Sequence, residues 1–189
     1  MEKEPGKEES IKYINIIKNK SETIQKLVED FYEVSLIEDK NYELELEKFL
    51  PAYIIEDTAM SYYNELEDNG IKLDLIIEED MEILGNQNAL ARVYSNLLSN
   101  IKKHGCEYAT IHHSIQNHQL TTTITNKIKP QATLEEDRLF EKFYTGEKSR
   151  HQTSSGIGMY SSKIMLEKMN HKITAKIHKG NMIITIIYN

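Results

Sequence analysis

The 189-residue sequence predicts an α+β fold: a two-layer α/β sandwich with three helices on one face of a mixed sheet, preceded by one long helix. Two observations carry this prediction. Stretches with apolar residues at every third or fourth position, typical of helices, are interspersed with stretches of alternating apolar and polar residues, typical of strands. The helices after residue 50 must bury their apolar faces on one sheet face, which leaves the other face open or only partly covered.

The first helical pattern runs from Ile11 to Asp39. Residues 1–10 are charged and contain Pro5 and Gly6, so we expect them to be disordered. In the helix, the stripe consists of Ile14, Ile17, Ser21, Ile24, Val28, Phe31 and Ser35, widened by Leu27 and Val34. An apolar seam of this width needs a partner helix.

The next elements are a strand over Tyr42–Lys48, a helix from Pro51 to Asn69 that Gly70 ends, and a strand over Ile71–Ile77. Glu78–Asp80 is then expected to be a solvated turn rather than a catalytic carboxylate pair.

A third helix begins at an N-cap supplied by Asn86 or Asn88 and ends at Gly105. The remaining expected elements are strands over 108–114 and 120–125, a helix over 157–169, and a hairpin of strands 172–178 and 182–188.

Asn96, Asn100 and Lys103 lie on one face of the third helix, beside its apolar stripe, because they are spaced by three or four residues. Carboxamide oxygens are suitable ligands for Mg²⁺, which usually shares its coordination shell with waters and substrate phosphates. This face therefore suits a magnesium polyphosphate, although it is equally consistent with the polar flank of an ordinary helix.

A second motif, Ser154–Met159, begins the 157–169 helix and contains Gly156 and Gly158. Without side chains at these positions, backbone N–H groups can approach an anion at the positive end of the helix. Between the two motifs, residues 139–150 combine an apolar anchor with a polar segment that carries cations.

Together these motifs resemble the catalytic domain of bacterial sensor histidine kinases, in the gyrase-type or Bergerat ATPase superfamily. Asn96–His104 resembles the N box, Phe140–Tyr144 the F box, and Ser155–Met159 the second glycine box. The order and spacing of the three motifs match the family, the resemblance covers nearly the whole chain, and the lid resembles that of Gram-positive kinases.

The resemblance implies a Bergerat ATP-binding domain over residues 41–189, preceded over residues 1–40 by the second helix of a dimerisation bundle. It implies ATP and Mg²⁺ as ligands, a homodimer formed through the N-terminal helix, and a response regulator as partner. The domain would present the γ-phosphate to an acceptor histidine, and the phosphate would then pass to an aspartate of the regulator.

The family's functional residues fall on specific positions of this sequence. Asn96, Asn100 and Lys103 form the implied catalytic set, and Asn100 is the implied metal ligand. The implied ATP-binding positions are Asn96, Asn100, Lys103, His104, Asn126, Tyr144, Lys148, Arg150, Gly156, Ile157, Gly158 and Met159.

Two departures from the family pattern stand out. An Asp-x-Gly-x-Gly box binds adenine in the family, whereas this chain has Asn126–Pro130 after the expected strand, with Asn for Asp and no glycine. Moreover, no acceptor-histidine segment occurs in the sequence, so this chain alone is not expected to phosphorylate itself. We interpret it as a fragment cut between the two bundle helices, with a naturally short protein as the alternative.

Composition limits the other function classes. The net charge of −7 is uneven: residues 1–100 hold 10 Lys/Arg and 23 Asp/Glu, whereas residues 101–189 hold 13 and 7. The basic half suits a triphosphate, and the acidic half argues against nucleic acid as a partner. No run of about 20 apolar residues is present, and the single Cys106 forms no internal disulfide, so we expect a cytoplasmic region without membrane contact.

Other candidate sites are weaker. Cys106, His112, His113 and His118 lack the spacing of a zinc site, and neighbouring strand residues point to opposite faces. Residues 146–149 imitate the end of a P-loop but fail on spacing. Phe140, Phe143 and Tyr144 are expected to anchor the lid in the core.

Two rival functions remain open. The altered adenine box favours a degenerate kinase-like module that binds no nucleotide and acts in dimerisation or regulator docking. A serine kinase of the anti-sigma type shares the fold, but the long N-terminal helix argues against it.

Overall fold

The computed structural model describes residues 7–39, 41–130, 134–145 and 155–189. The elements are α1 (Lys7–Glu38), β1 (Glu47–Phe49), α2 (Pro51–Asp68), β2 (Ile71–Ile77), β3 (Ile83–Gly85), α3 (Gln87–His104), β4 (Gly105–Gln116), β5 (Gln119–Ile128), the 3-10 turn η1 (Glu136–Arg138), α4 (Gly158–Lys168), β6 (Lys172–His178) and β7 (Asn181–Ile187). Five strands form a mixed sheet in the order β2-β4-β5-β7-β6, in which only the β2–β4 pair is parallel.

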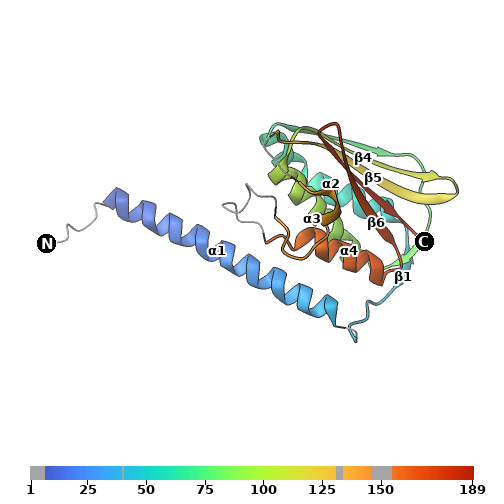
Figure 1. The fold of residues 1–189 in the computed structure, drawn as a ribbon, viewed down its shortest axis with the longest axis horizontal. Coiled ribbons are helices and arrows are strands. Elements are labelled where there is room, and N and C mark those ends of the chain that lie inside the picture. The colour runs from blue at the N-terminus through green and yellow to red at the C-terminus, as the bar shows by residue number, and fades with distance from the viewer. Residues whose placement is uncertain (1–6, 40, 131–133, 146–154) are drawn as a thin grey trace.

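The layers confirm the predicted sandwich (Figure 1). Helices α2, α3 and α4 cover one face of the sheet, and the long α1 runs separately from α2 and α3 to one side. A small second sheet pairs β1 with β3.

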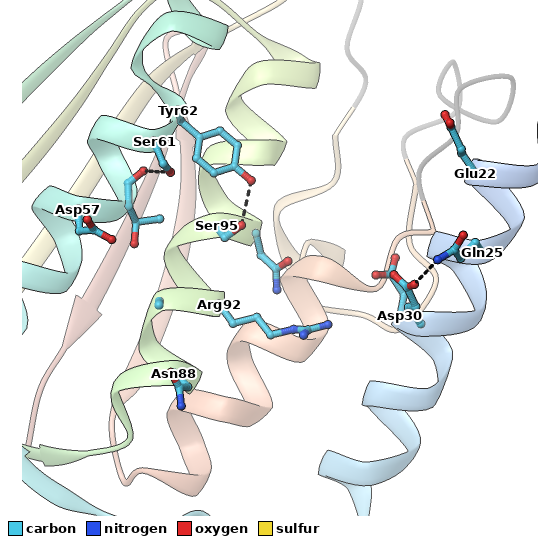
Figure 2. A pocket seen from close by; sticks show the side chains of 13 residues that line it. Glu22, Gln25, Asp30, Asp57, Ser61, Tyr62, Asn88, Arg92 and Ser95 are labelled. Atoms are coloured by element: carbon cyan, nitrogen blue, oxygen red, sulfur yellow. Dashed lines mark hydrogen bonds between the residues drawn. The ribbon is translucent and has the colours of Figure 1, made fainter. Parts of the chain in front are cut away.

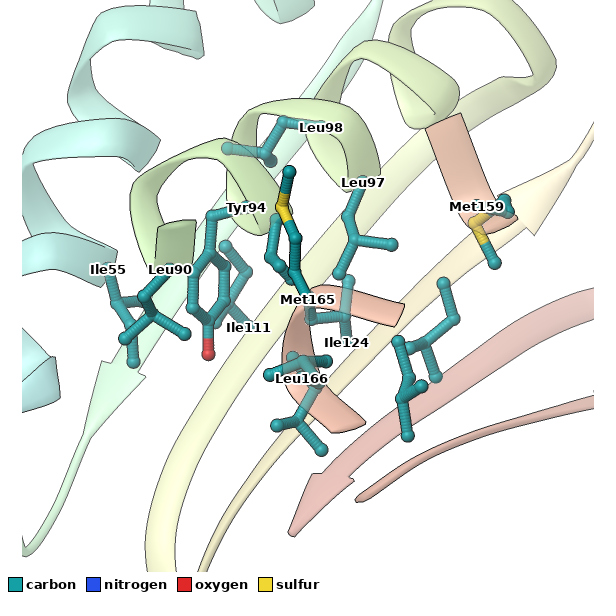
Figure 3. Close-up of a cluster of buried hydrophobic side chains, with 14 of the residues drawn as sticks. Ile55, Leu90, Tyr94, Leu97, Leu98, Ile111, Ile124, Met159, Met165 and Leu166 are labelled. Atoms are coloured by element: carbon teal, nitrogen blue, oxygen red, sulfur yellow. The ribbon is translucent and has the colours of Figure 1, made fainter. Parts of the chain in front are cut away.

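The core lies between the helices and the inner face of the sheet (Figure 3). Helix α3 is central: Leu90, Tyr94 and Leu97 are fully buried and face the inward residues Ile111 of β4 and Ile124 of β5. Burying each such side chain contributes roughly 1.5–3 kcal/mol. The remaining polar face of α3 is therefore held in a fixed position.

The ends of α3 agree with the sequence. The Asn86 side chain accepts a hydrogen bond from the Ala89 N–H at 2.9 Å, which makes it the N-cap. At the other end, a Cβ on Gly105 would lie 2.6 Å from the carbonyl oxygen of Ile101. A side chain there would force the chain to move, so glycine ends the helix.

Three expectations about local structure are wrong. Only the last two residues of the expected Tyr42–Lys48 strand pair, because β1 spans Glu47–Phe49 opposite the equally short β3. Residues 7–10, expected to be disordered, belong to α1, whereas residues 1–6 lie outside the described residues.

Asp80 is not a solvated turn residue. It accepts hydrogen bonds from the Ala52 N–H, at the start of α2, and from Nε2 of the buried His113, each at 3.0 Å. The carboxylate thus fixes the loop to the first turn of α2, while Glu78 and Glu79 are exposed as expected.

Helix α1 packs on the sandwich through its C-terminal part. Val34 and Ile37 are buried, but eleven other large apolar side chains of α1 are exposed: Ile11, Tyr13, Ile14, Ile16, Ile17, Ile24, Leu27, Val28, Phe31, Tyr32 and Leu36. Among the described helices, α1 included, none has a stretch long and apolar enough to cross a bilayer.

Candidate functional site

The N-box and glycine-box residues meet where α3 packs on α4. The Asn96 Nδ2 atom donates to the Ser161 hydroxyl at 3.2 Å and to the Ser162 hydroxyl at 3.4 Å, and both serines are buried. A Cβ on Gly158 would lie only 3.6 Å from the Asn96 side chain. Asn96 is therefore a contact between the two helices as well as a candidate ligand.

Asn100 lies one turn further along α3 and is half-buried. Among the described residues its side chain makes no hydrogen bond. Its carboxamide is consequently available to a ligand, in contrast with that of Asn96.

Gly156 joins the glycine box to the F box. Its φ of +65° lies in the left-handed region, and its carbonyl oxygen accepts from the Phe143 N–H at 3.1 Å. A Cβ there would lie 2.6 Å from the Tyr144 carbonyl oxygen, so only glycine fits this turn.

The N-terminus of α4 has no side-chain cap, unlike that of α3, where Asn86 is the cap. The first N–H groups of a helix have no partner within it, and together with the helix dipole they favour an anion. Because Gly156 and Gly158 flank this end without side chains, the turn fits a phosphate group.

Asn126 lies within β5 rather than after a strand, because β5 extends to Ile128. The side chain is 3% exposed, and its Nδ2 donates to the Lys127 carbonyl at 3.1 Å. It also lies beside Gly105, where a Cβ would be 3.3 Å from the Asn126 Nδ2. Asn126 is thus near the C-terminal end of α3.

Basic residues surround this end of α3. Lys129 Nζ donates to the Lys103 carbonyl at 2.7 Å, and the Lys129 N–H donates to the His104 carbonyl at 3.0 Å. Burial, together with the charges of Lys103 and Lys129, lowers the pKa of the His104 imidazole below 6.5. These surroundings therefore favour the neutral imidazole over the charged form.

The F-box residues differ in burial. Phe140 and Tyr144 pack against the core, as expected, but Phe143 is 54% exposed. The Tyr144 hydroxyl accepts from the Glu135 N–H at 2.7 Å, and the Arg138 guanidinium lies 4.8 Å from the Tyr144 ring centroid. The lid candidates Lys148 and Arg150 lie outside the described residues.

Sequence reasoning missed a set of contacts that fix α1 to this region. Glu38 accepts from Lys142 Nζ at 2.7 and 2.8 Å and from the Tyr160 hydroxyl at 2.6 Å. The hydrogen bond from Lys142, and to a lesser extent that from Tyr160, lowers the pKa of the Glu38 carboxyl. The same bond to Glu38 raises the pKa of the Tyr160 hydroxyl to about 12. About two turns before Glu38, Asp30 accepts from the Ser155 hydroxyl at 2.7 Å.

A second ion pair, between Glu33 of α1 and Arg92 of α3, lies between these two contacts. The signal for this docking face was present: Asp30, Val34, Ile37 and Glu38 share one helical face by their spacing. What the sequence did not supply was the identity of the partner residues.

A cleft of about 730 Å³ separates α1 from α2 and α3 (Figure 2). Of the candidate site residues that the structure describes, only Asn96 lines this cleft. The lining residues that the structure describes include four carboxylates (Glu22, Glu29, Asp30 and Asp57) and a single cation, Arg92. This charge balance disfavours a polyphosphate in the cleft.

Comparison with known proteins identifies the family. Residues 85–188, more than half of the chain, match the family model for histidine kinase-, DNA gyrase B- and HSP90-like ATPases. The chain belongs to this family. The match covers the N box and the glycine box and begins at the last residue of β3.

Individual relatives agree. The chain is 29% identical, over 92% of its length, to the sensor protein GtcS of Aneurinibacillus migulanus, and covers 48% of that protein. Among solved structures, the histidine kinase AdeS of Acinetobacter baumannii matches 99% of this chain and 86% of its own, with a TM-score of 0.77 and 17% identity. A structure of the histidine kinase ThkA with the response regulator protein TrrA matches 99% of this chain and 52% of its own, with a TM-score of 0.73 and 18% identity.

The structural likenesses establish the fold, α1 included. The chain spans about half the length of the curated relatives it matches. The members of this family are ATPases. The geometry of the glycine turn fits the phosphate groups of ATP.

Proposed function

We propose that this chain is the ATP-binding catalytic region of a two-component sensor histidine kinase. It presents the γ-phosphate of Mg-ATP to an acceptor histidine that lies outside the chain. The observation that carries the proposal is the meeting of three motifs at one point: Asn96 of α3 contacts α4 at Gly158, and Gly156 rests on the F box. The family match supports it.

Asn100 is the metal ligand in this proposal. The Asn96 amide is held by Ser161 and Ser162, so it orients the facing surfaces of α3 and α4, while the Asn100 carboxamide remains available for Mg²⁺. Neutral oxygen ligands of this kind hold Mg²⁺ together with water and phosphate oxygens.

The other candidate residues divide between phosphate and base. Lys103, Lys148 and Arg150 are the proposed cationic contacts to phosphate. Backbone N–H groups of residues 156–159, including Ile157 and Met159, surround the phosphates at the start of α4. His104, Asn126 and Tyr144 complete the nucleotide site, with Asn126 accepting from the adenine amino group.

Catalysis in this proposal consists of positioning and charge stabilisation. Phosphoryl transfer proceeds through a transition state with charge spread over the phosphate oxygens, so fixed N–H groups and cations are the protein's main contribution. No covalent intermediate with the domain is needed.

The test is a titration of ATP into the purified chain with and without Mg²⁺, comparing the parent with Asn100→Ala. We expect the variant to lose most of the Mg²⁺-dependent gain in affinity while keeping the parent's melting temperature. Asn88→Ala is the matched control, because Asn88 is an exposed asparagine about three turns earlier on the same helix. Equal Mg²⁺ dependence in Asn100→Ala and the parent would reject the metal assignment.

The partners follow from the same proposal. We take residues 1–40 as one helix of a dimerisation bundle and residues 41–189 as the catalytic domain. The exposed apolar face of α1 then pairs with a second copy, since large exposed apolar patches mark interaction sites. Deleting residues 1–39 should abolish self-association, and a monomeric parent at high concentration in light scattering would contradict the homodimer.

The resemblance to a kinase that was solved with its regulator supports a response regulator as the second partner. ATP is an intracellular ligand, so the proposal also places this region in the cytoplasm.

A second candidate function rests on Asn126. The family's charged adenine acceptor is replaced here by an amide that donates to the Lys127 carbonyl. This favours a degenerate module that docks partners without binding nucleotide. Absence of ATP binding in the titration above would favour the degenerate module over the kinase.

A further inference from the structure

Helix α1 is attached to the same residues that surround the glycine turn. Val34 and Ile37 are buried between two polar contacts, Asp30 at one end and Glu38 at the other. Glu38 holds Lys142, next to the F-box phenylalanine Phe143, and Tyr160, in the first turn of α4. The position of α1 is therefore coupled to the surroundings of the nucleotide site.

The Asp30 contact reaches the turn itself. Ser155 directly precedes Gly156; its hydroxyl donates to Asp30 Oδ2 at 2.7 Å and lies 3.4 Å from the Ile157 N–H. The Asp30 carboxylate is thus linked to the turn through a single hydrogen bond, the one from Ser155. It also occupies donor capacity that an anion at this turn would use.

A polyphosphate arriving at the turn faces two opposing effects. The negative charge of Asp30 repels it, and the Ser155 hydroxyl already has a charged acceptor. Both effects vanish when α1 moves away, because Asp30 is carried by α1 and not by the sandwich.

We propose that docked α1 antagonises polyphosphate binding, with Asp30 competing for the glycine turn against the phosphates of the nucleotide. The inference rests on the proposed function, because it requires a nucleotide at this turn. Coupling between two binding events is reciprocal, so the nucleotide weakens α1 docking by the same factor. A displacement of α1 would thereby be converted into a change in nucleotide affinity.

Glu38, Val34 and Ile37 contribute indirectly. They keep Asp30 close to Ser155 and so raise its effective concentration at the turn. Weakening the Glu38 contact should release the same antagonism to a smaller extent, without changing any charge beside the turn.

The experiment measures the dissociation constant of Mg-ATP for the full chain and for two variants. Asp30→Asn should bind at least about fivefold more tightly than the parent, the lower end of typical coupling between sites. Glu29→Gln is the matched control, because it removes the same charge from the residue directly before Asp30. The Glu29 carboxylate accepts a hydrogen bond from Gln25 of its own helix. The Glu29→Gln variant should stay within about twofold of the parent, because exposed charges at a distance are screened.

A ligand without phosphates distinguishes competition between Asp30 and the nucleotide phosphates from a general change of the fold. Adenosine should bind Asp30→Asn and the parent equally, since Asp30 acts on the phosphate end. Glu38→Gln, which removes the carboxylate that holds Lys142 and Tyr160, should tighten ATP binding by less than Asp30→Asn does.

Each outcome decides the matter. Tighter ATP binding by Asp30→Asn, with unchanged Glu29→Gln and unchanged adenosine affinity, supports the inference. Equal affinities of Asp30→Asn and parent, or equal gains in Asp30→Asn and Glu29→Gln, would overturn it while leaving the nucleotide site intact. If no variant binds ATP, the proposed function fails, and the inference fails with it.

Discussion

The two ends of the candidate site differ in how their residues are held. At the phosphate end, Asn96 bridges to the α4 serines, and Gly156 rests on the F-box backbone. At the base end, Asn126 projects from a strand and makes a hydrogen bond to the neighbouring Lys127 carbonyl. The residues of the proposed phosphate end are part of the packing, whereas the proposed base recognition relies on the chemistry of one side chain.

This difference has a physical consequence. A side chain at position 156 would force the chain to move, so the proposed binding role of Gly156 cannot be removed without also disturbing the local structure. Asn126 has nearly the shape of an aspartate, so the family's charged acceptor can be exchanged for an amide without disturbing the sheet. The phosphate end should consequently dominate nucleotide binding.

The largest expected effect is at Gly156. Gly156→Ala must adopt a left-handed φ and place its Cβ 2.6 Å from the Tyr144 carbonyl oxygen, which should cost about 3 kcal/mol in unfolding free energy and abolish ATP binding. Gly70→Ala is the control, because Gly70 has a φ of +70° but nothing within 4 Å of a Cβ. It should lose only about 1–2 kcal/mol and keep its ATP affinity. If denaturant unfolding gave the same loss of unfolding free energy for Gly156→Ala and Gly70→Ala, the close approach of residue 156 to Tyr144 would contribute nothing.

Asn126→Asp should have a smaller effect. A carboxylate accepting from the adenine amino group gives a hydrogen bond worth about 1.5–3 kcal/mol, against roughly 1 kcal/mol for a neutral acceptor. ATP should bind several-fold more tightly, and discrimination against GTP should sharpen. Since Asn126 is buried, the new charge should also lower the melting temperature of the free protein.

Asn117→Asp, in the exposed 117–118 turn, is the matched substitution for this test. If Asn126→Asp changes neither ATP affinity nor GTP discrimination in calorimetry, Asn126 is not at the adenine or the chain binds no nucleotide.

The smallest effect concerns pH at the base end. The lowered pKa of His104 means that the unfolded chain binds its proton more readily than the folded chain. The stability contribution is therefore fully present above about pH 6.5 and is lost as pH falls through the folded pKa. The loss should be below about 1 kcal/mol, because the ring is only partly buried.

His104→Gln should accordingly flatten the fall in melting temperature between pH 7.5 and 5.5. His118→Gln, in an exposed turn, should leave the slope unchanged. A parental slope in His104→Gln would mean that this imidazole does not titrate differently in the folded state.

Much of the sandwich was predictable from sequence because its elements carry strong local signals. The β2 strand and the helix α2 follow the expected boundaries closely, since alternation, Pro51 and Gly70 mark them. The meeting of Asn96 with the glycine box was implied by the order of motifs, but its basis in Ser161 and Ser162 was not. Those two serines look like ordinary helix residues until α3 is packed against α4.

Other features depended on tertiary partners. Tyr42–Lys48 has a strand pattern, but pairing begins only at Glu47, opposite the short β3. Asp80 looked like a solvated acid, yet it lies beside the buried His113. The docking of α1 needed both an acidic helix face and the basic or hydroxyl partners that the fold brings from residues more than 50 positions away.

The most direct test of the central claim is calorimetric titration of the full chain with ATP and GTP, each with and without Mg²⁺. The account predicts saturable binding that depends strongly on Mg²⁺, with GTP within several-fold of ATP, because the phosphate end carries most of the affinity. Binding that is insensitive to Mg²⁺ and strongly selective for adenine, or no binding of either nucleotide, would contradict it.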